Sequence, residues 1–228
     1  MVKEVSKNVV ESLLEEKVRK WCGITGSWRF KNRHLRNHLR NDVKRIVRRI
    51  LERGDGIVTG GALGIDYYAT DIVLEEGNPK NQLKIYLPTK IGDFLAHYGD
   101  CFDRLPKDRI ISREQVDEIT NQLFEIYKRF PEAIYDRTRF SKSYEKSYYE
   151  RNQKVVDAID KLYAFHVDES KGVQDTIDKA MIKGIPIYVY RYEIEKPNWA
   201  NGVLYEEFNI PEEKMRGKKF TDFKTSKR

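Results

Sequence analysis

The stretch Gly56-Ile57-Val58-Thr59-Gly60-Gly61-Ala62-Leu63-Gly64-Ile65-Asp66 is a short apolar run followed by a glycine-rich turn, and a helical pattern continues from it to Glu76. A helix N-terminus presents unpaired N–H groups and the positive end of the helix dipole. Glycines at 60, 61 and 64 remove the side chains that would keep a phosphate away from the backbone. The stretch therefore predicts a strand, a turn and a helix that bind a nucleotide-derived anion, although a tight turn can also need glycine for steric reasons alone.

The rest of the chain alternates apolar runs with helical periods. Strands are expected at residues 21–25, 57–59, 83–87, 161–165 and 185–190, and helices at 35–51, 66–76, 115–129, 151–159 and 172–183. This alternation predicts a Rossmann-like, doubly wound α/β domain with a mostly parallel sheet. We expect one domain over residues 21–210, preceded by an N-terminal helix over 1–20 and followed by a basic tail over 211–228. Residues 135–149 show no clear period and predict a loop over a site or a surface excursion.

The formal net charge of +7 is concentrated in two places. Residues 29–53 hold ten basic residues against two acidic ones, and the tail holds seven against three. Such segments suit a phosphate backbone, but they equally suit a solvated helix face and a soluble tail. No apolar run is long enough to cross a membrane, no signal peptide is evident, and Cys22 and Cys101 lack metal or redox spacing. These features predict a cytoplasmic protein without a membrane partner.

Ligands of open α/β sheets bind beyond the carboxyl ends of the strands. Three loops leave such ends here, at residues 26–29, 60–66 and 166–172, and each precedes a helix. Their glycines, hydroxyl groups and charged side chains, with a later arginine-asparagine pair, form the candidate ligand-binding set: Gly26, Ser27, Arg29, Gly60, Gly61, Gly64, Asp66, Arg151, Asn152 and Gly172. For Asp66, a helix cap is as good an interpretation as ligand contact.

These motifs resemble the SLOG superfamily of Rossmann-like domains, and within it the DNA-processing protein family DprA (Smf). The resemblance rests on the segment from Gly23 to Arg29, the glycine turn, the pair Arg151-Asn152 and the segment from Gly172 to Ala180, which come in the family's order. It implies phosphate binding at the strand ends and a role in handling single-stranded DNA. This chain departs from the family where Trp28 precedes Arg29 and where Val173 replaces a threonine.

The LOG-type phosphoribohydrolases, which release the base of nucleoside 5′-monophosphates, resemble the chain more distantly. Arg151 and Glu150 are the catalytic candidates for that chemistry. The LOG-type glutamate is replaced by Thr176, and the neighbouring Asp175 points about 100° away on a helix.

We therefore expect a protein that binds a nucleotide or single-stranded DNA, without a cofactor, and acts as a homodimer. The alternatives are a nucleoside monophosphate N-glycosidase and a sensor of a nucleotide-derived signal. A tyrosine-rich and basic group resembles a stacking surface for unpaired bases, and a polar-aromatic loop that packs on its own domain is the alternative. The group consists of Tyr135, Tyr144, Tyr148 and Tyr149 with Arg137, Arg139, Lys142 and Lys146. His34, His38 and Asp42 share a helix face, but no metal site is expected there.

Overall fold

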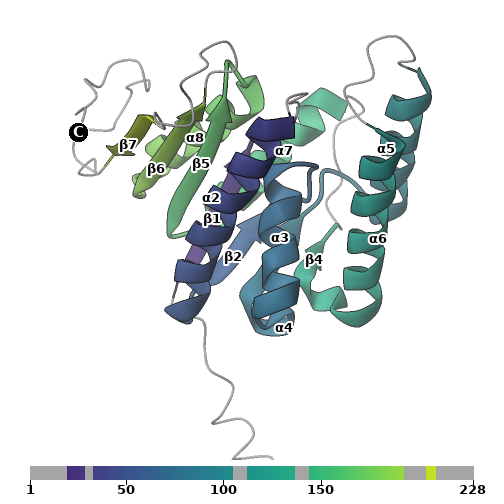
Figure 1. Cartoon of the computed structure of the whole chain (residues 1–228), viewed down its shortest axis with the longest axis horizontal. Coiled ribbons are helices and arrows are strands. Elements are labelled where there is room, and N and C mark those ends of the chain that lie inside the picture. The colour runs from purple at the N-terminus through teal and green to yellow at the C-terminus, as the bar shows by residue number, and fades with distance from the viewer. Residues whose placement is uncertain (1–19, 29–32, 105–111, 137–143, 193–203, 209–228) are drawn as a thin grey trace, which may run out of the picture.

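The computed structural model describes residues 20–28, 33–104, 112–136, 144–192 and 204–208. Within them, seven strands form one sheet in the order β4-β3-β2-β1-β5-β6-β7 (Figure 1). The first six strands along the chain run parallel, and β7 pairs antiparallel with β6. The strands are β1 (Trp21–Gly26), β2 (Gly56–Thr59), β3 (Leu83–Tyr86), β4 (Ile134–Tyr135), β5 (Lys161–Val167), β6 (Ile187–Tyr192) and β7 (Leu204–Phe208).

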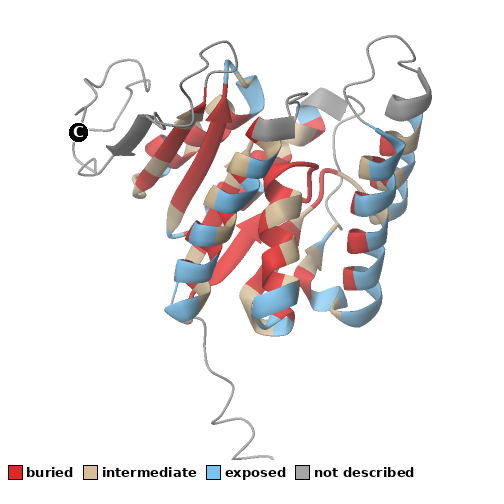
Figure 2. Cartoon of the chain, viewed as in Figure 1, coloured by how far each residue is buried: buried red, intermediate tan, exposed pale blue. Residues whose placement is uncertain are grey.

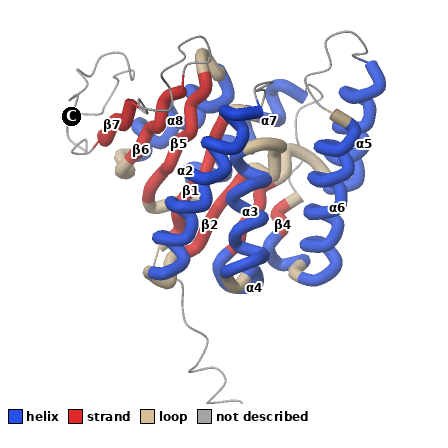
Figure 3. Tube along the Cα trace, in the orientation of Figure 1, coloured by secondary structure: helices blue, strands red, loops and turns tan. Residues whose placement is uncertain are grey.

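Helices connect the parallel strands and cover both faces of the sheet, as Figure 3 shows. They are α2 (Arg33–Glu52), α3 (Ile65–Glu76), α4 (Pro79–Gln82), α5 (Ile91–Arg104), α6 (Arg113–Arg129), the short 3₁₀ helix η1 (Pro131–Ala133), α7 (Tyr144–Asp157) and α8 (Lys171–Lys183). Helices α2, α3, α5 and α6 contribute to the hydrophobic cluster on one face, and α7 and α8 to the cluster on the other. The molecule therefore has three layers, which is the solution that buries both faces of a parallel sheet.

Strand β2 shows why the sheet needs helices on both sides. All four of its residues are buried. Ile57 packs into the cluster under α2 and α3, whereas Val58 packs into the cluster under α7 and α8. Successive side chains of a strand point to opposite faces, so a strand covered twice must be apolar throughout.

Helix α2 is amphipathic, and its apolar stripe faces the sheet. The stripe consists of Leu35, Leu39, Val43, Ile46, Val47 and Ile50, all of which are buried. The residues between them are largely exposed, as Figure 2 shows for this helix. Burying a side chain of this size stabilises the fold by about 1.5–3 kcal/mol, so packing on the sheet fixes the helix.

The predicted α/β, Rossmann-like fold with a mostly parallel sheet is confirmed. Each strand and helix predicted between residues 21 and 190 is present, with shifts of one or two residues at most ends. The main difference is α7, which begins at Tyr144 rather than near Arg151, and α4, α5, η1, β4 and β7 were not predicted. The predicted N-terminal helix and the basic tail of residues 211–228 lie outside the described residues.

The helices in the described part of the chain are too short or too polar to cross a bilayer.

Candidate functional site

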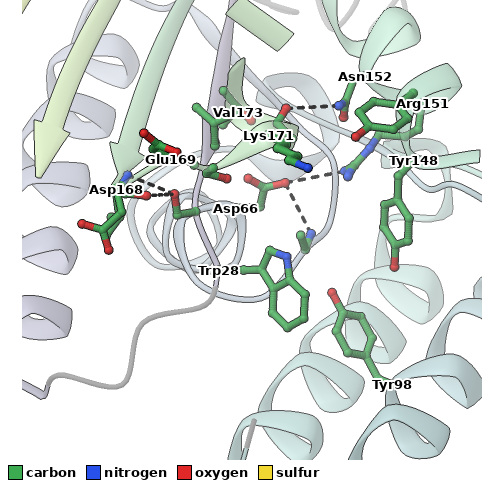
Figure 4. A pocket seen from close by; sticks show the side chains of 18 of the residues that line it. Trp28, Asp66, Tyr98, Tyr148, Arg151, Asn152, Asp168, Glu169, Lys171 and Val173 are labelled. Carbon is green, nitrogen blue, oxygen red and sulfur yellow. Dashed lines mark hydrogen bonds and ion pairs between the residues drawn. The ribbon is translucent and has the colours of Figure 1, made fainter. Parts of the chain in front are cut away.

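The sheet order places a crevice between β1 and β5. The chain leaves β1 toward β2 through α2 on one face, and leaves β5 toward β6 through α8 on the opposite face. The two connections separate at the carboxyl ends of these strands, which is the topological switch point where ligands of such sheets bind. A cavity of about 720 Å³ lies at this point (Figure 4). Residues of all three predicted loops line it, namely Gly26 and Ser27, then Ala62 and Asp66, and then the segment from Val167 to Gly172.

Ser27 joins the ends of β1 and β5 at the base of the cavity. Its buried hydroxyl accepts a hydrogen bond from the Val167 N–H at 3.0 Å and donates to the Val167 carbonyl at 3.3 Å. Its own N–H donates to the Phe165 carbonyl at 3.1 Å. The hydroxyl thus holds the two strand ends at a fixed separation. The phosphate contact predicted for Ser27 stays a prediction, and Arg29 lies outside the described residues.

The glycine turn after β2 wraps around a carboxylate of the chain itself. Oδ2 of Asp66 accepts hydrogen bonds from the N–H groups of Gly60, at 2.9 Å, and Ala62, at 3.4 Å. The next N–H group, that of Leu63, donates to the hydroxyl of Tyr98 at 3.2 Å. Asp66 is buried, and both of these hydrogen bonds tie it to the turn that precedes its helix. An internal anion therefore occupies the place that the sequence assigns to a ligand phosphate.

The three glycines of this turn are explained by close packing. A Cβ at Gly60 would overlap the guanidinium of Arg151, and a Cβ at Gly61 would press on Ile85 and Leu87. Gly61 and Gly64 also have positive φ angles of 65° and 77°, which side chains rarely adopt. None of the three lines the cavity. The phosphate contact predicted for them is not needed to explain them and stays a prediction.

Arg151 enters the cavity from α7 and is 7% exposed. Its Nη1 lies 3.7 Å from Oδ2 of Asp66, and its guanidinium carbon lies 5.5 Å from the centre of the Tyr148 ring. Its Nε has no hydrogen-bond partner among the described residues. A buried donor without a partner is costly, and the side chain that carries it lines a cavity large enough for a ligand. Arg151 therefore has donor capacity left for an anion.

The charge of the Asp66 carboxylate is opposed by its burial and favoured by its neighbours. Burial raises the pKa of the Asp66 carboxyl to about 6, while Arg151 and the N–H groups of Ala62 and Gly60 act to lower it. Asp66 is thus negatively charged at neutral pH, and its protonation there costs little free energy. Figure 4 shows Asp66 and Arg151 side by side at the edge of the cavity.

The N-terminus of α8 opens into the same cavity. Ser170, at the N-cap, makes no side-chain cap bond, and Lys171, Gly172 and Val173 line the cavity. A Cβ at Gly172 would meet nothing within 4 Å, so this first turn is open to a ligand. Helix N-termini attract anions through their N–H groups and dipole. Val173, where the resembling family has threonine, also packs into the cluster beneath α8.

Asn152 fixes this helix start relative to α7. Its side-chain amide donates to Oδ2 of Asp175 at 2.9 Å and to the Gly172 carbonyl at 3.3 Å. Asp175 is also held by Lys179, at 2.6 Å. The first turn of α8 and the helix that carries Arg151 therefore form one rigid unit.

Aromatic side chains form the remaining wall of the cavity. Trp28 follows β1, His97 and Tyr98 come from α5, and Tyr148 and Tyr149 from α7. The rings of His97 and Tyr148 lie 6.4 Å apart, and Figure 4 shows Trp28, Tyr98 and Tyr148 around one space. Tyr148 and Tyr149 belong to the predicted stacking group. Trp28, His97 and Tyr98 were not predicted, although the helical spacing of Ile91, Phe94, Leu95 and Tyr98 would have placed α5 beside the strand ends.

The catalytic candidates are separated by the geometry. Arg151 lines the cavity, but the half-buried Glu150 does not. Thr176, which replaces the LOG-type glutamate, is buried, and its hydroxyl donates to the Gly172 carbonyl at 3.0 Å. Asp175 is occupied by Asn152 and Lys179, as given above. Neither Glu150 nor Asp175 is therefore placed to assist at a sugar in this cavity.

The basic helix α2 lies away from this site, and its charges are largely paired. Arg40 pairs with Asp71 at 3.1 Å, and Arg48 makes two hydrogen bonds of 2.6 Å to Glu76. Lys44 lies 3.4 Å from the same Glu76. His38 and Asp42 pair with each other at 3.4 Å, and Asp42 also accepts from the Tyr192 hydroxyl. Acidic residues of α3 thus neutralise much of the basic face of α2, which the composition had suggested as a binding surface for a nucleic-acid backbone.

The fold and the crevice at its switch point define a Rossmann-like class of α/β domain. Among solved structures, the chain is similar to DNA processing protein A (DprA) from Helicobacter pylori, with a TM-score of 0.50 and 18% identity, over 81% of this chain and 71% of that one. It is also similar to DprA from Streptococcus pneumoniae, with a TM-score of 0.45 and 17% identity, over 81% of this chain and 54% of that one. The H. pylori structure is described as showing a single-stranded DNA binding mode. The predicted resemblance to DprA is thus confirmed at the level of the fold.

No family model and no curated protein sequence matches the chain.

Proposed function

We propose that this protein binds a nucleotide or single-stranded DNA, as DprA-like proteins do, and that one phosphate group occupies the cavity between β1 and β5. The observation that carries the proposal is the pairing of two anion-binding features at one cavity. The buried Arg151, whose Nε has no hydrogen-bond partner among the described residues, and the uncapped N-terminus of α8 both line it. A guanidinium donates strong hydrogen bonds to phosphate, and a helix N-terminus adds backbone donors.

The aromatic wall supports a nucleotide rather than a bare anion. Tyr148 is half-buried beside Arg151, and Trp28 and Tyr98 line the same space. Nucleobases stack on such rings without strong sequence preference, at about 1–3 kcal/mol per base. Burial raises the pKa of Tyr98, so its phenol stays protonated at all relevant pH values. A phosphate and a base attached to one sugar would use both sides of the cavity.

We propose binding without turnover as the function. N-glycosidic cleavage needs a carboxylate close to the sugar, and Glu150 does not line the cavity. Of the carboxylates that do line it, Asp66 is held by the glycine turn and by Arg151, and Asp168 and Glu169 are exposed to solvent. A nucleotide-signal sensor would use the same site and differs only in the ligand. The unpaired, buried Cys22 is in keeping with a cytoplasmic protein, and the homodimer expected from the sequence forms part of the proposal. Light scattering of the pure protein measures its assembly.

The test compares Arg151→Gln with Arg129→Gln, an exposed arginine on α6 that lies outside the cavity lining. Fluorescence anisotropy with a labelled oligothymidylate and calorimetry with thymidine 5′-monophosphate give the two affinities. We expect Arg151→Gln to weaken whichever ligand binds by about 10- to 100-fold, because a charge-assisted hydrogen bond is lost. Arg129→Gln leaves the affinity unchanged. Equal effects of the two variants, or binding to the wild type of neither ligand, contradict the proposal.

The same incubations decide between binding and catalysis. Chromatography of the nucleotide samples separates free base from intact ligand. We expect no free base. Base release that disappears in Arg151→Gln makes the N-glycosidase the function.

A further inference from the structure

Asp66 is a negative charge next to the place where a negatively charged ligand is proposed to bind. Its carboxylate lines the cavity and lies 3.7 Å from Nη1 of Arg151. A ligand phosphate at the free side of the guanidinium would share this cation with Asp66. The chain therefore supplies one anion of its own to a site for anions.

The position of Asp66 makes its charge count more than the other acidic groups at the cavity. Asp168 and Glu169 also line the cavity, but both are exposed, so water and salt screen them. Asp66 is 4% exposed and cannot turn away, because the N–H groups of Gly60 and Ala62 hold its Oδ2. Charges in such surroundings interact several times more strongly than charges in water.

Building on the proposed function, we propose that Asp66 determines how much negative charge the cavity accepts, so that it admits the single charge of a phosphodiester and opposes the second charge of a terminal phosphate monoester. The ligand class that this selects is an internal phosphate of a nucleic-acid strand or a nucleotide diester. Asp66 acts here through charge alone and makes no contact with the ligand.

The selectivity follows from counting charges at the cavity. Arg151 contributes a full positive charge and the α8 N-terminus about half of one. Asp66 removes a full negative charge from this total. What remains is about half a positive charge, which is closer to the single negative charge of a diester than to the two charges of a monoester. Each further ligand charge is met by repulsion from Asp66. Asparagine at position 66 has nearly the same shape and can accept the same two backbone hydrogen bonds, but it carries no charge.

The experiment uses two probes that differ by one charge. These are thymidine 5′-monophosphate, which is a dianion at about pH 8, and its methyl ester, which stays a monoanion. We expect Asp66→Asn to raise the affinity of the monophosphate at least about fivefold more than that of the methyl ester. Glu169→Gln, the matched change at an exposed carboxylate, shifts the ratio of the two affinities by less than about twofold. An unchanged ratio in Asp66→Asn, or an equal shift in Glu169→Gln, overturns the inference.

A measurement on the unaltered protein covers the case that Asp66→Asn does not fold. The methyl ester does not titrate, so any change of its affinity with pH comes from the protein. Because burial raises the pKa of Asp66 to about 6, we expect the methyl ester to bind more tightly as the pH falls through this value. Calorimetry in two buffers of different ionisation enthalpy then shows a proton taken up on binding.

The other titratable groups around Asp66 determine which control variant the pH experiment needs. Tyr98 and Tyr148 face it from α5 and α7, and Lys171 on α8 also lines the cavity. Tyrosine and lysine side chains ordinarily titrate far above this range. His97 lines the cavity, and histidine is the side chain that ordinarily titrates near this pH. The pH dependence persists in His97→Gln if Asp66 causes it, and its loss there overturns the inference. Binding of neither probe to the wild type is the separate result that removes the proposed function, and the inference with it.

Discussion

The guanidinium of Arg151 fills the space that a Cβ at Gly60 would need. The turn after β2 thus packs so closely against Arg151 of helix α7 that one further carbon atom would not fit between them. This contact holds Arg151 at the edge of the cavity. The absence of a side chain at position 60 makes room for the guanidinium of Arg151. A substitution at position 60 can therefore displace the side chain of Arg151 while residue 151 itself stays an arginine.

Gly60→Ala is expected to displace Arg151 and to lose ligand affinity. The added methyl group costs about 1–3 kcal/mol of stability through overpacking and weakens phosphate binding at least about tenfold. Gly92→Ala, at an exposed position of α5 with nothing within 4 Å, leaves affinity unchanged and raises stability slightly. Thermal unfolding and anisotropy on both variants check this. A folded Gly60→Ala protein with wild-type affinity would show that Arg151 does not bind the ligand.

Asp66→Asn is expected to change how stability depends on pH. The pKa of the Asp66 carboxyl is about 6 in the folded protein, above its ordinary value of 3.8, so the folded state binds this proton more tightly than the unfolded state. The contribution of Asp66 to stability therefore falls as the pH rises from about 4 to about 6, by an amount on the order of 1–3 kcal/mol, and stays constant above. Urea unfolding across this range should show the fall in wild type and in Asp117→Asn, an exposed control on α6, but not in Asp66→Asn.

Asn152→Asp is expected to loosen the start of α8. It places a carboxylate 2.9 Å from the carboxylate of Asp175 and removes the donor to the Gly172 carbonyl. We expect a loss of about 1–3 kcal/mol of stability near neutral pH, because Lys179 compensates only one of the two charges. The loss should shrink at acidic pH, because one proton shared by two adjacent carboxyl groups removes their repulsion. A chemical-denaturation series over pH measures this, and equal stability of Asn152→Asp and wild type would show that the link between α7 and α8 is unimportant.

The replacement of Arg36, Arg40 and Lys44 by alanine tests the basic helix as a DNA-binding face. From the sequence, this change should flatten the salt dependence of binding. In the structure Arg40 and Lys44 pair with acidic residues of α3, so we now expect the salt slope for an oligothymidylate to stay the same. A slope reduced by about 0.7 per lost phosphate contact, measured by anisotropy over a range of salt, would show that the strand runs along α2 after all.

The fold could be predicted well from the sequence because most helices and strands bury an apolar stripe or an apolar run against a neighbouring layer. A stripe such as that of α2 and a fully apolar strand such as β2 carry a clear period. The first turns of α7 do not, since Tyr148 and Tyr149 face the cavity rather than the core. Helix α5 interrupts its stripe with Gly92 and Gly99, which hid it.

The sequence also indicated the three loops that meet at the site, because parallel strands end at the same edge of a sheet. It could not show that the glycine turn binds the carboxylate of Asp66, since a turn that holds a ligand anion and one that holds an internal anion need the same glycines. Nor could it pair Asp66 with Arg151, which lies on a helix far along the chain. Contacts of this kind depend on tertiary packing alone.

The structure of the protein in complex with a short oligothymidylate tests the central claim most directly. The account predicts a phosphate between Arg151 and the N-terminus of α8, with an oxygen about 2.7–3.2 Å from the guanidinium of Arg151 and from a backbone nitrogen of the segment Lys171 to Val173. It also predicts a base against Tyr148 or Trp28. A strand bound along α2, or elsewhere with the cavity empty, would contradict it.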